Sequence, residues 1–364
     1  MESFLEEFGL SNAEGLALMC LAEALLRVPD ETTADRLIAE KISTGKWDEH
    51  LGKSDHWLVN AGTWGLMLTG RIAALPEEMK GDAGQFLARL VNRVSEPVVR
   101  EAAMQAMRIL GEQFVLGRNI DAALRRGAAM ARGQSATRYS FDMLGEGART
   151  NADAERYEQS YAAAIKAVGA DRAASDAHGT SKSGPEGWRS KNGVSVKLSA
   201  LHPRYEARQQ ERVFAELYPR VLRLAELAKR YDIGLTLDAE EADRLVLSLK
   251  ILEQLAHEPS LANWAGLGLA VQAYQKRTRA LIERLVQLAR RRGAPLQVRL
   301  VKGAYWDGEI KRAQIMGRPD FPVWTTKAAT DVHYLACARD LLAAGDAIFP
   351  QFATHNAHTV AAVR

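Results

Sequence analysis

From residue 139 onward, apolar runs of strand length alternate with amphipathic segments of helix length, and this alternation constrains the fold more than any other feature. All runs but the last are followed by a full helix pattern. Such alternation, with nearly continuous apolar strands, is typical of a parallel sheet covered by helices. Its regular recurrence predicts an α/β fold of the TIM type, a (β/α)8 barrel, rather than a doubly wound sheet. The predicted strands are 139–145, 194–201, 234–239, 267–274, 296–301 and 349–354.

The alternation supplies about six of the eight βα units of a closed barrel. The chain ends at THNAHTVAAVR, inside the sixth helical pattern, so we expect a barrel that is incomplete at its C-terminal end. The preceding part has helical patterns throughout, and a polar, glycine-rich stretch from 170 to 193 predicts an exposed loop within the barrel. We therefore predict two regions, an all-helical arm or linker at 1–135 and the barrel at 136–364.

Composition excludes several classes of function. The formal net charge is only +3, with acids interspersed among the cations, so we expect no nucleic-acid partner. Cys20 and Cys337 form no disulfide framework, and His355 and His358 lack a clear third ligand, so we expect no metal site. The acidic start is unlike a signal peptide, and no apolar run approaches the ~20 residues that span a bilayer. We expect a cytoplasmic protein, with a peripheral contact at the inner face of the membrane left open.

The segment VRLVKGAYWD, residues 298–307, joins a predicted strand to two cations, a glycine and two aromatic residues. A buried strand rarely carries Arg299 without a partner or a function. Gly303 permits a ligand to approach the backbone closely, and Tyr305 and Trp306 offer flat surfaces near the end of the strand. The pattern indicates a planar, electron-accepting cofactor.

Polar residues stand at the ends of the predicted strands, where barrels of this type gather their functional groups. Lys197 and Asp238 fall on neighbouring strands, and we expect them to pair. Pairing would keep both charged for an ionic or zwitterionic ligand, although a purely structural ion pair remains an alternative. The strand-end residues are Asp142, Lys197, Asp238, Gln272, Arg299, Lys302, Thr354, His355 and Asn356.

Six ordered motifs between Phe141 and the end of the chain resemble the proline dehydrogenase domain of the bifunctional proline utilization A flavoproteins. The resemblance implies an enzyme of proline catabolism, which oxidises L-proline to 1-pyrroline-5-carboxylate with FAD and passes the electrons to a quinone. It also implies that the helical region is the arm and linker that precede the barrel in that family. The motifs are VSVKLSALHPRYE, LTLDAEEADRL, LAVQAYQKR, VRLVKGAYWD, PVWTTKAATDVHYLACA and FPQFATHNAHT.

The resemblance also implies roles for single residues. Arg299, Lys197 and Asp238 form the catalytic set: Arg299 stabilises negative charge on the reduced flavin, Lys197 binds the proline carboxylate, and Asp238 supports Lys197 or the ring nitrogen. Ala304 and Tyr305 pack against the proline ring. The implied cofactor-binding residues are Asp238, Gln272, Arg299, Val301, Gly303, Ala304, Tyr305, Trp306, Thr325, Lys327, Thr354, His355 and Asn356.

The chain departs from the family pattern in two respects. Thr326 occupies the position between Thr325 and Lys327 where the family usually has arginine. The paired arginines that clamp the substrate carboxylate in the family, and its aldehyde dehydrogenase domain, are not found in this chain. We therefore expect weak or no proline turnover by this chain alone.

Two other readings remain open. The first is a lyase with a TIM barrel that forms a Schiff base through Lys197 or Lys302, but it leaves Gln272 and Arg299 unexplained. The second takes the helical first third as an oligomerisation module without its own catalysis. This reading is compatible with the enzyme and predicts a homo-oligomer.

Overall fold

The computed structural model describes residues 115–131, 137–145, 147–177 and 192–364. Nearly all of them belong to one compact unit, Asn119–Arg364, on which the description below rests. The helices predicted before residue 115 lie outside the described residues. The described end of the predicted helical region does contain a helix, α6 (Ile120–Met130), which begins at the N-cap Asn119.

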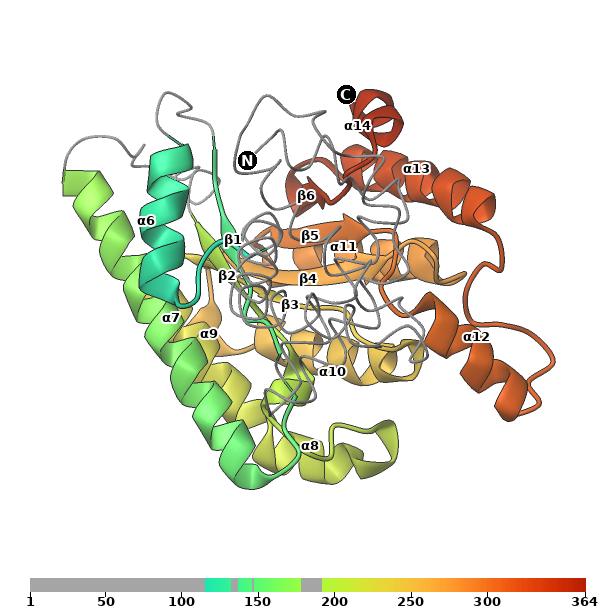
Figure 1. Cartoon of the computed structure of the whole chain (residues 1–364), viewed down its shortest axis with the longest axis horizontal. Helices are drawn as coiled ribbons and strands as arrows, with labels where there is room; N and C mark the ends of the chain where they lie inside the picture. Colours follow the sequence, from blue (N-terminus) through green and yellow to red (C-terminus); the bar gives the residue numbers. More distant parts are fainter. Residues whose placement is uncertain (1–114, 132–136, 146, 178–191) are drawn as a thin grey trace, which may run out of the picture. The chain divides into compact units, whose positions relative to one another are not determined.

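The sheet of this unit has six parallel strands in the order β1 to β6, so each strand pairs with the next one in the sequence (Figure 1). A doubly wound sheet reverses its strand order, whereas sequential parallel pairing is the arrangement of a (β/α) barrel. The predicted fold class is therefore confirmed, with six strands of the barrel described. The strands are β1 (Ser140–Phe141), β2 (Gly193–Val196), β3 (Gly234–Leu237), β4 (Leu267–Gln272), β5 (Leu296–Val301) and β6 (Ile348–Phe352).

Helices follow the strands and pack against the sheet and one another (Figure 1). Contacts join α7 to α9, α10 to α11 and α11 to α13, while α9, α11 and α13 also contact β3, β5 and β6 respectively. Apolar side chains bury this side of the sheet, and β4 is buried along its whole length. The helices are α7 (Asn151–Ala177), α8 (Gln210–Glu216), α9 (Tyr218–Arg230), α10 (Leu245–Ala256), α11 (Thr278–Arg292), α12 (Trp306–Ile315), α13 (Lys327–Ala343) and α14 (Ala357–Val363).

Several predicted boundaries were wrong. The strand predicted at 139–145 is reduced to the two residues of β1, and those predicted at 234–239, 267–274 and 349–354 end two residues early, at Leu237, Gln272 and Phe352. The strand predicted at 194–201 ends at Val196, because residues 198–200 form a 3-10 turn. Leu198 and Ala200 are nevertheless buried, so their apolar character came from core packing and not from an extended strand. The loop predicted at 170–193 was wrong over 170–177, because α7 continues to Ala177 through an alanine-rich segment with high helix propensity, and residues 178–191 lie outside the described residues.

The face of the sheet opposite these helices is polar. Gln297 on β5 occupies its floor, and it fits there because Gly268 and Gly234 have no side chains: a Cβ on them would come within 2.9 and 3.1 Å of the Gln297 side chain. The Gln297 carboxamide accepts a hydrogen bond from Gln351 on β6 at 3.0 Å. Side chains alternate along a strand, so Arg299 lies on the same face, one step nearer the C-terminal ends of the strands.

Candidate active site

A cavity of about 660 Å³ lies at the C-terminal ends of the strands. Its volume is typical of small-molecule and cofactor sites, which occupy about 300–1,000 Å³. The lining includes every site residue predicted from the sequence except Asp142, Trp306, Thr325 and Lys327. The lining residues are Lys197, Asp238, Ala239, Ala270, Gln272, Arg299, Val301, Lys302, Gly303, Ala304, Tyr305, Ala353, Thr354, His355 and Asn356.

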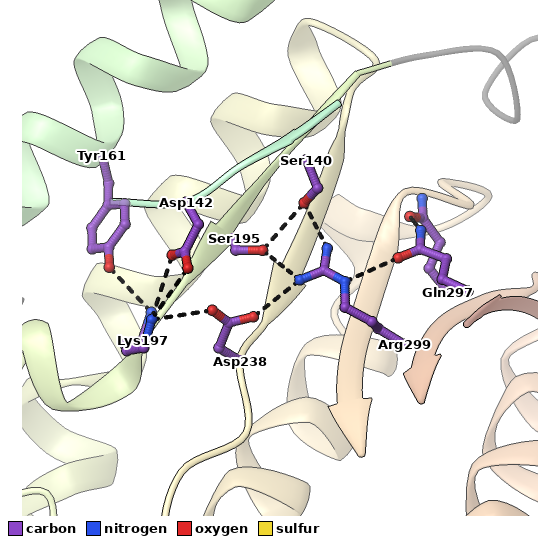
Figure 2. Close-up of polar contacts among 9 residues, drawn as sticks. Ser140, Asp142, Tyr161, Ser195, Lys197, Asp238, Gln297 and Arg299 are labelled. Carbon is purple, nitrogen blue, oxygen red and sulfur yellow. Dashed lines mark hydrogen bonds and ion pairs between the residues drawn. The ribbon is translucent and has the colours of Figure 1, made fainter. Parts of the chain in front are cut away.

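Lys197 and Asp238 directly follow two paired strands, β2 and β3, whose last residues lie in register. The Lys197 Nζ lies 3.4 Å from Asp238 Oδ2, so the predicted pair is confirmed. It also lies 3.4 Å from Oδ1 of Asp142, which follows β1. Figure 2 shows this ammonium between the two carboxylates. The side chains of Lys197 and Asp238 are 23% and 13% exposed, so the pair is shielded from solvent but reachable from the cavity.

The Arg299 guanidinium lies on the other side of Asp238 and contacts four strands or strand ends (Figure 2). Its Nη1 donates to Asp238 Oδ1 at 3.2 Å and to Ser195 Oγ at 2.8 Å. Its Nη2 donates to Ser140 Oγ at 2.6 Å, and its Nε donates to Gln351 Oε1 at 3.3 Å. Arg299 therefore links β5 to β1, β2 and β6 and to the end of β3.

Two cations thus alternate with two carboxylates in one cluster. Burial raises the pKa of Asp142 above its usual value, and the charge of Asp238 raises it further, while Lys197 and Arg299 act in the opposite direction. Burial also raises the pKa of Tyr305, which lines the same cavity, so its hydroxyl stays neutral. The cluster can neutralise an anionic group beside Lys197 or Arg299 and can receive a proton at a carboxylate.

Gln272, at the end of β4, connects the loops that follow β3 and β5. Its Nε2 donates to the carbonyl of Glu240 at 2.8 Å, and its Oε1 accepts from the amide of Ala304 at 3.1 Å. The neighbouring Gly303 has φ of +144°, and a Cβ there would overlap the ring of Tyr274. The hydrogen bond between Gln272 and Ala304 and the close packing of Gly303 against Tyr274 fix the backbone conformation at 303–304 along the wall of the cavity.

The two cations of VRLVKGAYWD, Arg299 on β5 and Lys302 directly after it, point in different directions. Unlike Arg299, Lys302 directs its ammonium to α13, where it lies 2.6 Å from Asp331. Asp331 also pairs with Lys327 at 2.6 Å, and hydrogen bonds from Lys302 and then Lys327 lower the pKa of this carboxyl. The Lys302 ammonium is therefore engaged on the helical side, away from the Arg299 cluster.

The predicted cofactor residues at the edges of the site have partners of their own. Trp306 is 41% exposed and donates its indole N–H to the carbonyl of Trp324 at 2.8 Å. Asn356 caps α14 by accepting from the amide of Thr359 at 2.9 Å, as its residue type predicts. The Asn356 amide in turn donates to Thr354 Oγ1 at 3.0 Å.

Ser140 and Ser195 are contacts of Arg299 that sequence reasoning missed. A signal for them was present, because each stands two residues before a strand-end residue, Asp142 or Lys197, and side chains two apart share a face of a strand. Serine is common in every structural context, so this spacing alone does not single them out. Their importance becomes visible only when β5 is placed opposite β1 and β2.

The described part of the chain contains neither a metal cluster nor a membrane-spanning helix. No three His, Cys, Asp or Glu side chains there are grouped so as to hold a metal ion. Nor does any described helix have both the length and the apolar character needed to cross a bilayer.

A sequential parallel α/β sheet with a charged cavity at its strand ends defines a protein of the TIM-barrel class. Comparison with known proteins then gives the family. The family model for proline dehydrogenase matches residues 124–364, and the chain belongs to the proline dehydrogenase family. A second family model, the DNA-binding domain of proline dehydrogenase, matches residues 1–114.

Individual relatives agree with this assignment. The chain is 52% identical to the bifunctional protein PutA of Salmonella typhimurium and 51% identical to that of Escherichia coli K12, in each case over 100% of this chain and 26% of the relative. It thus spans about a quarter of the length of these curated relatives. A crystal structure of a Bradyrhizobium japonicum proline utilization A mutant is similar, with 49% identity and a TM-score of 0.66 over 99% of this chain and 34% of that one. Another similar structure, of proline utilization A with proline bound in remote sites, has 52% identity and a TM-score of 0.66 over 99% of this chain and 35% of that one.

Proposed function

We propose that this chain carries a proline dehydrogenase centre, which oxidises L-proline to 1-pyrroline-5-carboxylate with FAD and delivers the electrons to a quinone. The observation that carries the proposal is the cluster of Lys197, Asp238 and Arg299 on the wall of the strand-end cavity, in a chain of the proline dehydrogenase family. The names of the relatives, bifunctional PutA proteins, agree with it.

The lining of the cavity fits a flavin. Gly303 and Ala304 give the wall after β5 only backbone and a methyl group, against which a flat ring can lie, while the space of a Gly303 Cβ is itself filled by the Tyr274 ring. Arg299 supplies a fixed positive charge, and Thr354, His355 and Asn356 supply polar groups of the lining after the neighbouring strand β6. We propose that these residues, with Asp238, Gln272, Val301, Ala304 and Tyr305, hold the cofactor, and that Trp306, Thr325 and Lys327 contact the part of it that extends beyond the cavity. When bound, the flavin accepts the hydride and passes the electrons on.

The charged residues have separate tasks in this proposal. Oxidation of proline removes a hydride from the ring carbon beside the nitrogen and a proton from the nitrogen itself. Lys197 binds the proline carboxylate through its ammonium, and Ala304 and Tyr305 pack against the ring. Asp238 lies 3.4 Å from Lys197 and orients it or the ring nitrogen, while Arg299 stabilises negative charge near the cofactor.

We also propose an arrangement for the whole chain. Residues 1–135 form a helical arm or linker and residues 136–364 the barrel, and the start of the family match at residue 124 supports a boundary nearby. We further propose a cytoplasmic protein that contacts the inner face of the membrane peripherally, where a quinone is accessible, and that forms a homo-oligomer. The absence of a nucleic-acid partner stays a prediction from the charge distribution of the chain.

The Schiff-base reading is less well supported. A Schiff base requires a neutral amine, whereas Lys197 lies between two carboxylates and Lys302 pairs with Asp331 at 2.6 Å. Trapping with borohydride in the presence of a carbonyl substrate separates the two readings. A covalent adduct at either lysine would favour the lyase.

The visible absorption spectrum of the purified protein tests the cofactor, and proline-dependent reduction of a dye tests the reaction. We expect a bound-flavin spectrum from the chain alone, with weak or no turnover, and turnover from a protein of the relatives' full length. The Arg299→Gln variant should lose flavin or flavin reduction, while Arg290→Gln, at the last turn of α11, should not. A full-length protein that neither retains FAD nor binds added FAD would refute the proposal.

A further inference from the structure

Two serines hold the plane of the Arg299 guanidinium from across the sheet. Ser195 Oγ lies 2.8 Å from Nη1 and Ser140 Oγ lies 2.6 Å from Nη2, so each terminal nitrogen has its own serine (Figure 2). An arginine has only N–H donors, so both serine oxygens act as acceptors. The two hydroxyls are also 3.2 Å apart, which lets one donate its hydrogen to the other. The donors and acceptors in this part of the cluster are therefore matched.

The environment of the serines makes this arrangement specific. Ser195 is fully buried, with 0% of its surface exposed, and lies on β2 in register with Thr236 on β3. A buried hydroxyl without a partner is costly, so Ser195 and the guanidinium depend on each other. Ser140 lies on the exposed part of β1 and closes the opposite edge of the guanidinium.

We propose that Ser140 and Ser195 are positioning residues for Arg299, which fix the orientation of its guanidinium toward Asp238 and the cavity. This inference rests on the proposed function, in which Arg299 stabilises the reduced cofactor. Arginine has many rotamers, and its bonds to Asp238 and Gln351 alone leave rotation about the end of the side chain open. The serines restrict this rotation with neutral acceptors, which leave the positive charge of Arg299 undiminished for the cofactor.

The test compares single and double alanine variants of the two serines in the full-length flavoprotein. Thr236→Val is the matched control, because it removes a buried hydroxyl at the same level of the neighbouring strand, with no described bond to Arg299. Ser140→Thr keeps the hydroxyl at an exposed strand position and should behave as wild type. The Arg299→Lys variant keeps a positive charge on this side chain but displaces it, so it shows the effect of a displaced cation.

We expect S140A/S195A to lower kcat/KM for proline about tenfold, mainly through kcat, as for the loss of hydrogen bonds to a charged group. The flavin reduction potential should become more negative, in the direction of the Arg299→Lys variant, because a displaced cation stabilises the reduced flavin less. T236V should leave the potential unchanged. A potential of S140A/S195A equal to that of wild type, with R299K shifted, would overturn the inference. If the double variant does not fold, S140A alone gives the same comparison, because its position is exposed.

A second measurement is independent of the cofactor. The urea midpoints of the flavin-free S195A, R299Q and S195A/R299Q variants form a double-mutant cycle. We expect the double variant to lose less stability than the sum of the losses in the two single variants. Additive losses would overturn the positioning role. If the wild-type protein binds no flavin or is not reduced by proline, the proposed function fails, while the cycle still decides whether the serines and Arg299 act together.

Discussion

Asp238 accepts a hydrogen bond from Arg299 at 3.2 Å through Oδ1. Its other oxygen, Oδ2, faces Lys197 at 3.4 Å. One carboxylate therefore separates the cation assigned to the substrate from the cation assigned to the cofactor. Because each carboxylate oxygen has a different partner, a substitution of Lys197 or Arg299 affects the other cation through the side chain of Asp238.

Replacing Lys197 by methionine should weaken proline binding while the flavin stays bound. The loss of one charge-assisted contact corresponds to about 2–3 kcal/mol, or roughly a hundredfold in kcat/KM, with most of it in KM. Steady-state kinetics and the flavin absorbance of the full-length protein measure both quantities. Lys250→Met, at an exposed lysine of α10, should change neither. An unchanged KM for proline would remove Lys197 from the substrate site.

Replacing Gly303 by alanine should lower the free energy of unfolding by about 3 kcal/mol. Its φ of +144° is unfavourable for alanine, and the new Cβ would overlap the Tyr274 ring. Gly308→Ala is the matched control, since nothing lies within 4 Å of a Cβ at this position of α12. We expect it to raise stability by about 0.5–1 kcal/mol, as alanine favours helix. Urea unfolding of the two variants compares them, and equal stabilities would contradict the close packing at Gly303.

Replacing Gln272 by leucine should leave the Glu240 carbonyl and the Ala304 amide without their partner. We expect a loss of about 1–3 kcal/mol of stability, together with weaker retention of flavin, because Gln272 connects two walls of the cavity. Gln314→Leu, at an exposed position of α12, should be nearly neutral. Thermal unfolding and flavin content measure the two effects, and a stable Q272L protein with full flavin would show that the bridge is dispensable.

The titration of Asp142 should depend on its charged neighbours in opposite directions. Because burial and then Asp238 raise its pKa, Asp238→Asn should lower that pKa, and Lys197→Met should raise it further. The folded state holds this proton more tightly than the unfolded state. Stability should therefore fall as pH rises from the usual value of 3.8 through the raised pKa.

Carboxyl carbon NMR of the variants follows the pKa of Asp142 directly. Unfolding at several pH values gives the corresponding change in stability, which should disappear in the Asp142→Asn variant. If Asp238→Asn raised the pKa of Asp142, the electrostatic account of the cluster would be wrong.

Strand positions were largely predictable from the sequence, and long-range polar contacts were not. The run at 296–301 coincides with β5, because its apolar residues end at polar or glycine-containing segments on both sides. Lys197, Asp238 and Gln272 were predictable as strand-end residues, since a parallel sheet brings such ends to one edge. Their common cavity follows from the sequential order of the strands.

The contacts of Arg299 had no comparable local signal. Ser195 and Ser140 are 104 and 159 residues away from it in sequence, and only the curvature of the sheet brings them within hydrogen-bonding distance. The direction of Lys302 also depends on Asp331, which belongs to α13, the second helix after β5. Alternation along a strand separates the two faces, but it does not say which neighbour each side chain meets.

The glycines beneath Gln297 have an evolutionary consequence. Gly234 and Gly268 make room for this carboxamide, and the carboxamide in turn holds Gln351, which contacts Arg299. A larger residue at Gly234 therefore requires a smaller residue at position 297, and such a change would remove the support of the guanidinium. At Gly268 a Cβ would also lie 2.9 Å from the backbone carbonyl of Gln297, which no substitution at 297 relieves. In an alignment of homologues, positions 234 and 297 should covary, whereas position 268 should stay glycine.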